Sequence, residues 1–443
     1  MQWLPEHNME LPKTERRIAV ATLGCKVNQY DTSVVERLVR QRGWRIVPFD
    51  QAADAYVVNS CSVTDRADAE SRQLARRARR QNPQAKVILT GCFAQVAPHR
   101  AAIPEVDYVV GLNRIDDLLR AIAGELEMRI AVDELRTARR IRTVGGGVVA
   151  GHTRAFLKVQ EGCNLFCSFC IVPFSRGASR SLSEYQVLDE LRRMEAEGVV
   201  EVVLTGVHLG AWGSDLRPQR EVADLVETLL ARTSVPRIRL SSLDPPEVSP
   251  RLLDLFTRSD RLCPHLHIPI QAGHDEVLRR MRRRYDTAFV GELLREIQRR
   301  LPDASIGTDV IAGFPGETEE QFEMALAWLD SLPIHYFHVF PYSRRSGTTA
   351  AKMEGQLPRQ IVRKRAKRLR SVDAAHRSAF ARRFVGRMLR VLVERVSGNG
   401  GVGVGYSQNY LRVHAVGVER TNMEVSVLVE GVHETGVWGR CLA

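Results

Sequence analysis

The sequence predicts an α/β protein with an amino-terminal open parallel sheet, a central partial barrel of six strand–helix units and a small carboxy-terminal β-barrel. Three observations predict this fold class. Strand and helix patterns alternate over about the first 120 residues, and they alternate again from residue 156 onward. Short strands rich in valine and glycine follow over about the last 60 residues. We expect domains at 15–125, 151–380 and 381–443, with a linker at 126–150.

Composition narrows the class of protein. The formal net charge of +12 and the pI near 9.6 favour a polyanionic partner, most simply nucleic acid. No apolar run approaches the roughly 18 residues of a membrane span, and the start, from Met1 to Arg17, is a loose leader without a signal-peptide core. We therefore expect a cytoplasmic protein with no membrane partner. The eight cysteines favour metal binding or catalysis over a disulfide framework.

The first domain is predicted from four short apolar strands with helices between them. Strands are expected at 17–22, 55–59, 86–90 and 107–110, and helices at 32–42 and 67–81. Cys25, Cys61 and Cys92 each come just after one of these strands. Loops at the carboxyl ends of parallel strands meet at one edge of a sheet, so we expect the three thiols to lie together.

Three convergent cysteines at that edge favour an iron–sulfur cluster with three protein ligands and one open iron. The alternative is three separate buried thiols, which are common in α/β cores. Gly24 and Gly91 would let the backbone come close to a cluster. The helix after Cys61 is crowded with arginines, which form either a solvated face or an RNA contact. Arg76 and Arg80 are the candidate RNA contacts there.

A second group of cysteines opens the central domain, after a linker that the glycine run 145–147 predicts to be flexible. Cys163, Cys167 and Cys170 have a C-x3-C-x2-C spacing and follow an apolar strand. Thiolates this close together suit a [4Fe–4S] cluster, whose fourth iron then stays open for another ligand. A zinc knuckle or a disulfide would each need a partner that the segment does not supply.

Six strands define the partial barrel, and the loops after them carry candidate cofactor contacts. Strands are expected at 156–160, 201–205, 237–241, 265–269, 305–311 and 335–340, and helices near 184–197, 221–231, 275–283, 287–301 and 318–331. In such barrels the chemistry lies at the carboxyl ends of the strands. The candidate contacts to an adenosine-bearing cofactor are Phe169, Thr205, Gly206, Ser241, His267, Gln271, Asp309, Gly313 and Pro315. His265 and His267 alternate on one strand, and we interpret His267 as a polar position lining the barrel rather than a metal ligand.

Two strongly basic segments favour contact with phosphates. The run 279–284 holds five cations in six residues, which repel one another unless they are solvated or paired with anions. The segment 359–383 holds ten Lys or Arg and one acid, Asp373, at helix-compatible spacing. The candidate RNA contacts are Arg282, Arg283, Arg365 and Arg368.

The last domain is predicted from short strands at 387–394, 409–414, 424–429 and 436–441. A small β-barrel of this kind often holds RNA, and Tyr410 beside Arg412 would suit stacking on bases. The alternative is a structural lid with a packed tyrosine. Cys263 and Cys441 are expected to be plain thiols.

Several segments of the chain, and the order of its three parts, resemble known families. The stretch 160–170, with its three cysteines, resembles the cluster motif of the radical S-adenosylmethionine (SAM) enzymes. The three-part order of the whole chain is similar to the methylthiotransferases. The segments 22–30, 66–68 and 340–345 resemble the subgroup that modifies N6-threonylcarbamoyladenosine beside the tRNA anticodon. His208 and Trp212 stand where that resemblance leads us to expect Asn and Tyr.

The resemblance implies two [4Fe–4S] clusters and insertion of sulfur at a C–H bond. The cluster at Cys163, Cys167 and Cys170 would bind SAM and cleave it reductively to a 5′-deoxyadenosyl radical. That radical would remove a hydrogen from C2 of the adenine, sulfur held at the other cluster would take its place, and a second SAM would supply the methyl group. The implied partners are tRNA, an electron donor such as flavodoxin or ferredoxin, and a sulfur donor.

Other substrates and another class of function remain open at this point. The same chemistry on isopentenyladenosine of tRNA, or on a ribosomal protein aspartate, is the alternative within the family. A non-catalytic iron–sulfur protein that binds RNA or senses redox state is the alternative from another class. It would keep clusters and RNA affinity but form no 5′-deoxyadenosine on reduction.

Overall fold

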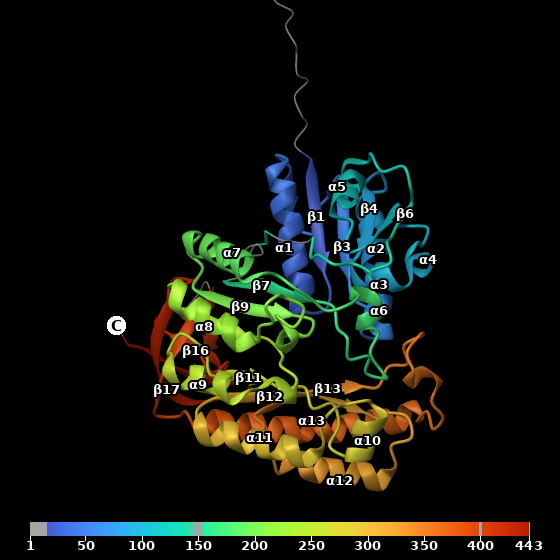
Figure 1. Cartoon of the computed structure of the whole chain (residues 1–443). Coiled ribbons are helices and arrows are strands. Elements are labelled where there is room, and N and C mark those ends of the chain that lie inside the picture. The colour runs from blue at the N-terminus through green and yellow to red at the C-terminus, as the bar shows by residue number, and fades with distance from the viewer. Residues whose placement is uncertain (1–15, 143–144, 147–152, 398–400, 443) are drawn as a thin grey trace, which may run out of the picture.

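The computed structural model describes residues 16–142, 145–146, 153–397 and 401–442. Its three parts follow the predicted order, with the parallel sheet at the top of Figure 1, the central strands below it and the β-barrel at the left. Residues 1–15, expected to be a leader, and Gly147 of the glycine run lie outside the described residues. Among the described residues, no helix is both long and apolar enough to cross a membrane.

The amino-terminal sheet is parallel throughout, as expected for alternating strands and helices. Its strand order is β2 (Arg45–Val47), β1 (Arg17–Thr22), β3 (Ala55–Ser60), β4 (Lys86–Thr90), β5 (Tyr108–Val110) and β6 (Ile130–Ala131). Its helices are α1 (Lys26–Gln41), α2 (Asp65–Gln81), α3 (Gly91–Val96), α4 (Pro98–Ala101) and α5 (Ile115–Ala123). Two apolar cores, one around Tyr56 and Leu89 and one around Ile18 and Val57, pack in this domain.

One predicted boundary in this domain differs from the structure, and two of its strands were not predicted. Helix α1 begins at Lys26 rather than residue 32, because the left-handed turn at Gly24 (φ +91°) lets the chain enter the helix at once. Strands β2 and β6 were not predicted, since segments of two or three residues carry no periodic pattern. Strand β6 lies inside the predicted linker, 126–150, and pairs with β5 of the sheet.

The described part of the linker is packed rather than free. The carbonyl of Gly145 accepts a hydrogen bond from Nη1 of Arg37 on α1 (2.9 Å), and the carbonyl of Gly146 accepts one from Arg193 of the central domain. These contacts join the two described glycines of the run 145–147 to α1 and to the central domain.

All six predicted strands of the central domain are confirmed. They are β7 (Arg154–Glu161), β9 (Glu201–Gly206), β10 (Arg237–Leu240), β11 (His265–His267), β12 (Ser305–Ala312) and β13 (Tyr336–Pro341). The hydrogen-bonded order runs β10-β9-β7-β8, where β8 is Arg180–Ser181, and then β11-β12-β13. A parallel bridge between Ser242 and His267 joins the two sets. The strands therefore follow one another around a partial barrel.

Helices surround the central strands and extend beyond them. They are α6 (Val172–Arg176), α7 (Glu184–Ala196), α8 (Val222–Arg232), α9 (Pro250–Arg258), α10 (Asp275–Arg280), α11 (Thr287–Arg300), α12 (Glu319–Asp330) and α13 (Arg359–Arg382). Helices α6 and α9 and the two-residue strand β8 (Arg180–Ser181), antiparallel to β7, were not predicted.

The carboxy-terminal domain is a closed barrel, which confirms the predicted architecture. Its order is β14 (Met388–Ser397), β15 (Val402–Ser407), β16 (Arg412–Val416), β18 (Gly436–Cys441) and β17 (Glu424–His433). Strand β15 was not predicted. Strand β16 begins at Arg412 rather than residue 409, because Tyr410 has a left-handed backbone (φ +65°) that an extended strand cannot contain.

This barrel packs against the first residues of the central strands. Arg237, at the start of β10, forms an ion pair with Glu424 (3.3 Å). The ring of His265, at the start of β11, lies 4.4 Å from the ring of Tyr410 between centroids. Arg239 donates a hydrogen bond to the carbonyl of Gln408 (2.8 Å). The barrel thus closes the end of the central domain opposite the loops that carry its cysteines.

Candidate functional site

The sheet edge brings the three amino-terminal cysteines together. Cys25 caps α1 after β1, Cys61 follows β3, and Cys92 lies in α3 directly after β4. Burial raises the pKa of Cys61 to about 12, and the nearby Cys92 and Cys25 thiols add to this rise. Burial likewise raises the pKa of Cys92. Cys61 and Cys92 are buried, whereas Cys25 is exposed. The two buried thiols need a positive centre to become thiolates, which is what iron would provide.

Gly24 leaves room for these sulfurs. A Cβ atom added at Gly24 would lie 2.7 Å from Sγ of Cys61, closer than any real contact, and φ is +91°. Glycine is therefore required here both by the backbone and by the neighbouring thiol.

We expect Gly24→Ala to lose iron from the amino-terminal triad. The new methyl group must displace the Cys61 thiol, and the left-handed backbone adds about 1–2 kcal/mol of strain. A chain with a four-iron cluster at each triad would hold about eight irons, and the variant should then hold about four. Gly43→Ala is the matched control, since Gly43 is also left-handed (φ +74°) but nothing lies within 4 Å of its added Cβ. Equal iron content in both variants would contradict the expectation.

The second triad lies in the loop between β7 and α6. Burial raises the pKa of Cys170 to about 12, with the Cys167 and Cys163 thiols close enough to contribute. Burial also raises the pKa of Cys167. Cys163, Cys167 and Cys170 are each partly exposed as residues.

Neither triad is compact enough for a single shared ion. Across the described residues, the one group of three ligand atoms within 4.8 Å of one another is His267, Asp309 and His338. Four sulfurs around one zinc ion stand only about 3.8 Å apart, given a Zn–S bond of about 2.3 Å. A cube of four irons binds each cysteine at a separate corner, so more widely spaced thiols fit it better. The spacing of the thiols in the described structure therefore does not match a single zinc ion.

Basic side chains reach both triads from the central domain. Nε of Arg176 lies 3.4 Å from Sγ of Cys92, across the domain boundary. Nη1 of Arg283 lies 3.1 Å from Sγ of Cys167, and its other nitrogen contacts Asp244. Arg283 was predicted to bind RNA. It is instead a largely buried residue of the cysteine site, because the turn after α10 folds back over the cysteine loop.

His208 occupies a similar position beside Cys163. Burial alone would lower the pKa of His208, but its contacts with the Cys163 thiol and the Glu247 carboxylate raise it to about 10. His208, which stands where the resemblance led us to expect Asn, thus points at the cysteine loop.

A buried charge network ties the first triad to the central domain. Arg176, which is 1% exposed, contacts Asp31 of α1 (2.9 Å) and Glu161 at the end of β7. Lys158 contacts the same two carboxylates, at 2.6 and 3.1 Å. Burial alone would raise the pKa of Glu161, but Lys158 and Arg176 outweigh it and hold that pKa at about 2. The charged network fixes the edge of the parallel sheet against the cysteine loop of the central domain.

A cavity of about 180 Å³ lies beside the second triad, where Cys170 and residues just after Cys61 line it together. Its walls combine Cys170 and its neighbours with Val63 and Thr64, which follow Cys61, and with the end of β13. The lining residues are Val63, Thr64, Phe169, Cys170, Ile171, Val172, Gln271, Asp309, Ile311, Phe340, Pro341, Tyr342 and Ser343. Three predicted cofactor contacts, Phe169, Gln271 and Asp309, are therefore in one pocket.

The other predicted cofactor contacts lie along the same edge without lining this cavity. Thr205 and Gly206 end β9, Ser241 follows β10, and Gly313 and Pro315 follow β12. The buried hydroxyl oxygen of Ser241 has no hydrogen-bond partner among the described residues, so it is free to bind a ligand.

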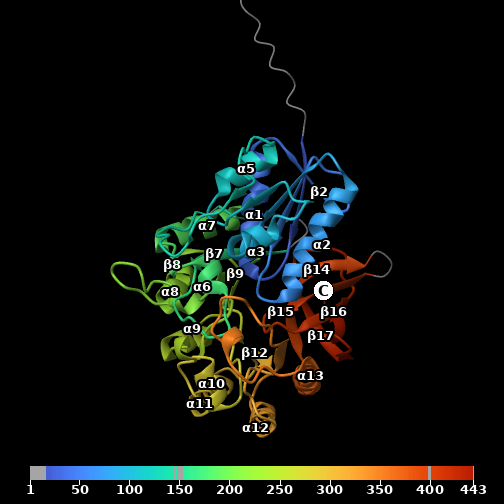
Figure 2. The ribbon, with the colours of Figure 1, turned by 90° about the vertical axis from the view of Figure 1, so that its right-hand side faces the viewer.

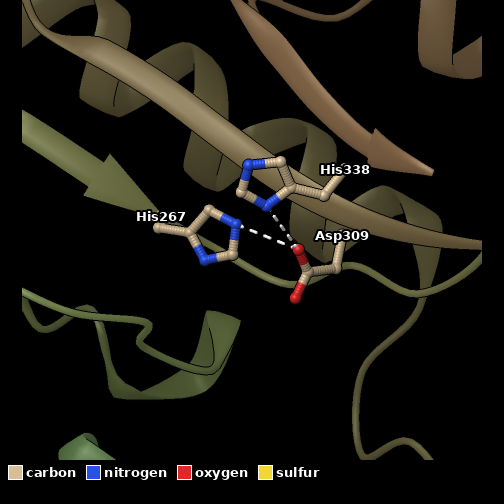
Figure 3. A group of neighbouring side chains, drawn as sticks. All are labelled: His267, Asp309 and His338. Atoms are coloured by element: carbon tan, nitrogen blue, oxygen red, sulfur yellow. Dashed lines mark hydrogen bonds and ion pairs between the residues drawn. The ribbon is translucent and has the colours of Figure 1, made fainter. Parts of the chain in front are cut away.

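Asp309 is held by two histidines (Figure 3). Oδ1 of Asp309 lies 3.1 Å from Nε2 of His267 and 3.1 Å from Nδ1 of His338. Burial alone would raise the pKa of Asp309, but these two rings lower it below its ordinary value. The hydroxyl of Ser242 fixes the other nitrogen of His267 (2.8 Å). The trio keeps Asp309 ionised and oriented beside the cavity.

Four other predicted RNA contacts differ in their exposure and in their partners. Arg80 and Arg282 are exposed, and Arg76 forms an ion pair of 3.6 Å with Glu105. Arg412 begins β16 and is partly buried.

Arg365 and Tyr410 require correction. Arg365 is 3% exposed and pairs with Glu317 and Glu319, both at 2.8 Å. The ring of Tyr410 packs at a tilt against that of His265 and lies under the guanidinium of Arg239 (4.9 Å), so it joins two domains. Arg365 is buried and paired inside the protein, whereas Tyr410 is partly buried.

Two family models match the chain: Uncharacterized protein family UPF0004 over residues 17–111 and the Radical SAM superfamily over residues 157–329. Among solved structures, the radical S-adenosylmethionine methyltransferase TsrM from Kitasatospora setae matches with a TM-score of 0.53 and 17% identity. The match covers 74% of this chain and 76% of that chain, and it shows the fold alone. Fold and motif together define a radical SAM protein with an additional amino-terminal domain.

Curated relatives narrow this class. Threonylcarbamoyladenosine tRNA methylthiotransferase MtaB of Bacillus subtilis is 38% identical over 91% of this chain and 91% of its own length. The protein of the same name in Aquifex aeolicus is 36% identical over 93% of this chain and its whole length. A tRNA-2-methylthio-N(6)-dimethylallyladenosine synthase of Desulfitobacterium hafniense is 30% identical over 98% of this chain. This chain belongs to the radical SAM methylthiotransferase family and is a transferase.

Proposed function

We propose that this chain converts N6-threonylcarbamoyladenosine beside the tRNA anticodon to its 2-methylthio derivative, using SAM. The observation that carries the proposal is the cavity that Cys170 of one triad and the loop after Cys61 of the other line together. One adenine there would face Cys170 on one side and the loop after Cys61 on the other. The substrate named for the relatives at 38% and 36% identity supports this choice over dimethylallyladenosine.

The two triads would hold two [4Fe–4S] clusters with different tasks. When bound, the cluster at Cys163, Cys167 and Cys170 supplies the electron that cleaves SAM, and the cluster at Cys25, Cys61 and Cys92 supplies the site where sulfur is held. An electron donor such as flavodoxin or ferredoxin and a separate sulfur donor complete the reaction. Because the substrate is tRNA, we place the protein in the cytoplasm.

The residues of the chain bind and orient the reactants. Asp309, kept ionised by His267 and His338, would accept hydrogen bonds from a hydroxyl or amino group of the cofactor. The free hydroxyl of Ser241 would bind the same molecule. The apolar wall formed by Phe169 and Phe340 would exclude water from the reacting carbon.

A second interdomain contact shapes the cavity. Arg345, 5% exposed, donates to Ser62 (2.7 Å), Asp68 (2.8 Å) and Asp65 (2.6 Å). It thereby joins the segment 340–345 to the loop after Cys61. Both segments carry motifs that resemble the threonylcarbamoyladenosine subgroup, so we propose that Arg345 is a positioning residue for this substrate.

Arg345→Lys should lower kcat/KM for tRNA on the order of 100-fold, because lysine cannot form the forked contact that aligns the two loops. Cleavage of SAM without tRNA should remain, since the second triad is untouched. Arg66→Lys is the matched control, as Arg66 is exposed and lies in the segment 66–68, whose Asp68 Arg345 contacts. An equal loss of SAM cleavage in Arg345→Lys would show general damage instead of positioning.

The substrate is tested by competition. Reconstituted enzyme receives equal amounts of two tRNAs, one with N6-threonylcarbamoyladenosine and one with isopentenyladenosine, and the nucleosides are analysed by mass spectrometry. We expect the methylthio group on the first nucleoside. A methylthio group on isopentenyladenosine would keep the chemistry and overturn the substrate, and product on neither would overturn the proposal for tRNA.

A further inference from the structure

Helix α13 carries cations on two faces with different surroundings. One face points at acids of the preceding segment: Arg365 pairs with Glu317 and Glu319, and Arg368 pairs with Glu323. These arginines are therefore already paired with acids in or near α12.

The other face carries cations without acidic partners. Arg359, Arg363, Lys367 and Arg370 follow one another at steps of four, four and three residues, so they lie along one face of the helix. All four are exposed, and no ion pair joins any of them to an acid within the described ranges. We call these four residues the α13 stripe. Like charges at this spacing repel one another, which costs stability unless an anion binds.

The stripe begins close to the proposed active site. Helix α13 packs on β13, and the residues at and after the end of β13, Phe340 to Ser343, line the cavity. Val362 on the first turn of α13 lies beside Gly313, which follows β12 at the edge that carries the cofactor contacts. Figure 2 shows α13 between the carboxy-terminal barrel and α12. The helix thus leads from the cavity along the outside of the molecule.

A rigid row of cations of this length fits the sugar–phosphate backbone of a nucleic acid. Four positions along a helix span about 17 Å at 1.5 Å per residue. Phosphates of one RNA strand lie roughly 6 Å apart, so the row matches several successive phosphates. The net charge of +12 favours the same partner.

We propose that the α13 stripe binds the phosphate backbone of the tRNA whose adenosine enters the cavity. This inference rests on the proposed function and adds the surface that holds the RNA. It replaces Arg365 and Arg368, predicted from the sequence as RNA contacts, by the residues on the free face of the same helix.

The test compares two triple variants that remove the same charge. Arg363→Gln, Lys367→Gln and Arg370→Gln together should weaken binding of the unmodified substrate tRNA about tenfold or more at low salt, and flatten the dependence of log K on log salt by about two. The control combines Arg217→Gln, Arg232→Gln and Arg258→Gln, three exposed arginines that have no acidic partner in the described structure. It should bind tRNA within about twofold of the unchanged chain.

A third variant separates charge from shape. Arg363→Lys, Lys367→Arg and Arg370→Lys keep the positive row and should bind tRNA like the unchanged chain, because phosphate contacts here depend on charge. Reductive cleavage of SAM without tRNA should be equal in all variants, which shows that each is folded and carries its cluster.

The outcomes distinguish this inference from the proposed function. Unchanged tRNA affinity in the glutamine triple, or equal weakening in the control, overturns the α13 stripe even when the enzyme forms methylthio product. Weaker tRNA binding in the glutamine triple but not in the control supports the α13 stripe. If the unchanged chain then forms no methylthio product, only the proposed function fails.

Discussion

Changing Cys163 to Ala is expected to abolish reductive cleavage of SAM, whereas changing Cys25 to Ala is expected to leave cleavage intact and stop sulfur insertion. The reason is that the two cysteines belong to different triads in different domains. Cys163 shares its loop with Cys167 and Cys170, while Cys25 lies with Cys61 and Cys92 at the edge of the parallel sheet. The measurement is 5′-deoxyadenosine and methylthio nucleoside from the same anaerobic reaction.

Cys263→Ala is the control for this pair. Cys263 is fully buried beside β10 and far in sequence from both triads, and its variant should keep both activities. Loss of SAM cleavage to the same extent in Cys25→Ala and Cys163→Ala would refute the division of labour between the triads.

The Arg176→Met variant is expected to lose about 3 kcal/mol of unfolding free energy. Removing the guanidinium leaves the buried carboxylates of Asp31 and Glu161 with less positive charge, and it removes the contact with Cys92. Methionine fills a similar volume, so the loss reports charge rather than packing. The measurement is the first transition in urea unfolding, because a chain of three domains unfolds in steps.

Arg192→Met is the matched control, since Arg192 is exposed on α7. It should change the unfolding free energy by no more than about 0.5 kcal/mol. An Arg176→Met variant as stable as this control would show that the network does not hold the two domains together.

The sequence predicts the strands and the two cysteine groups because both follow local rules. A parallel sheet gathers the loops after its strands, so Cys25, Cys61 and Cys92 were expected at one edge before any coordinates. Short strands such as β2 and β6 were not predicted, because two or three residues are too few to show a periodic pattern of apolar side chains.

Contacts between distant segments could not be predicted in the same way. The roles of Arg283 and Arg365 depend on which acids or thiols other loops bring to them, and helix spacing does not contain that information. Tyr410 looked suited to stacking on a base, and its partner is a ring of the central domain. Arg176 was missed for the same reason, although a cation six residues after Cys170 was a usable sign.

The most direct test of the account follows the hydrogen on C2. The reconstituted enzyme is incubated anaerobically with SAM, a reductant and tRNA whose N6-threonylcarbamoyladenosine carries deuterium at C2 of the adenine. The account predicts deuterium in the 5′-deoxyadenosine and a methylthio group at the carbon that lost it. Methylthio product accompanied by 5′-deoxyadenosine without deuterium, or cluster-loaded enzyme that cleaves SAM and leaves the nucleoside unchanged, would contradict it.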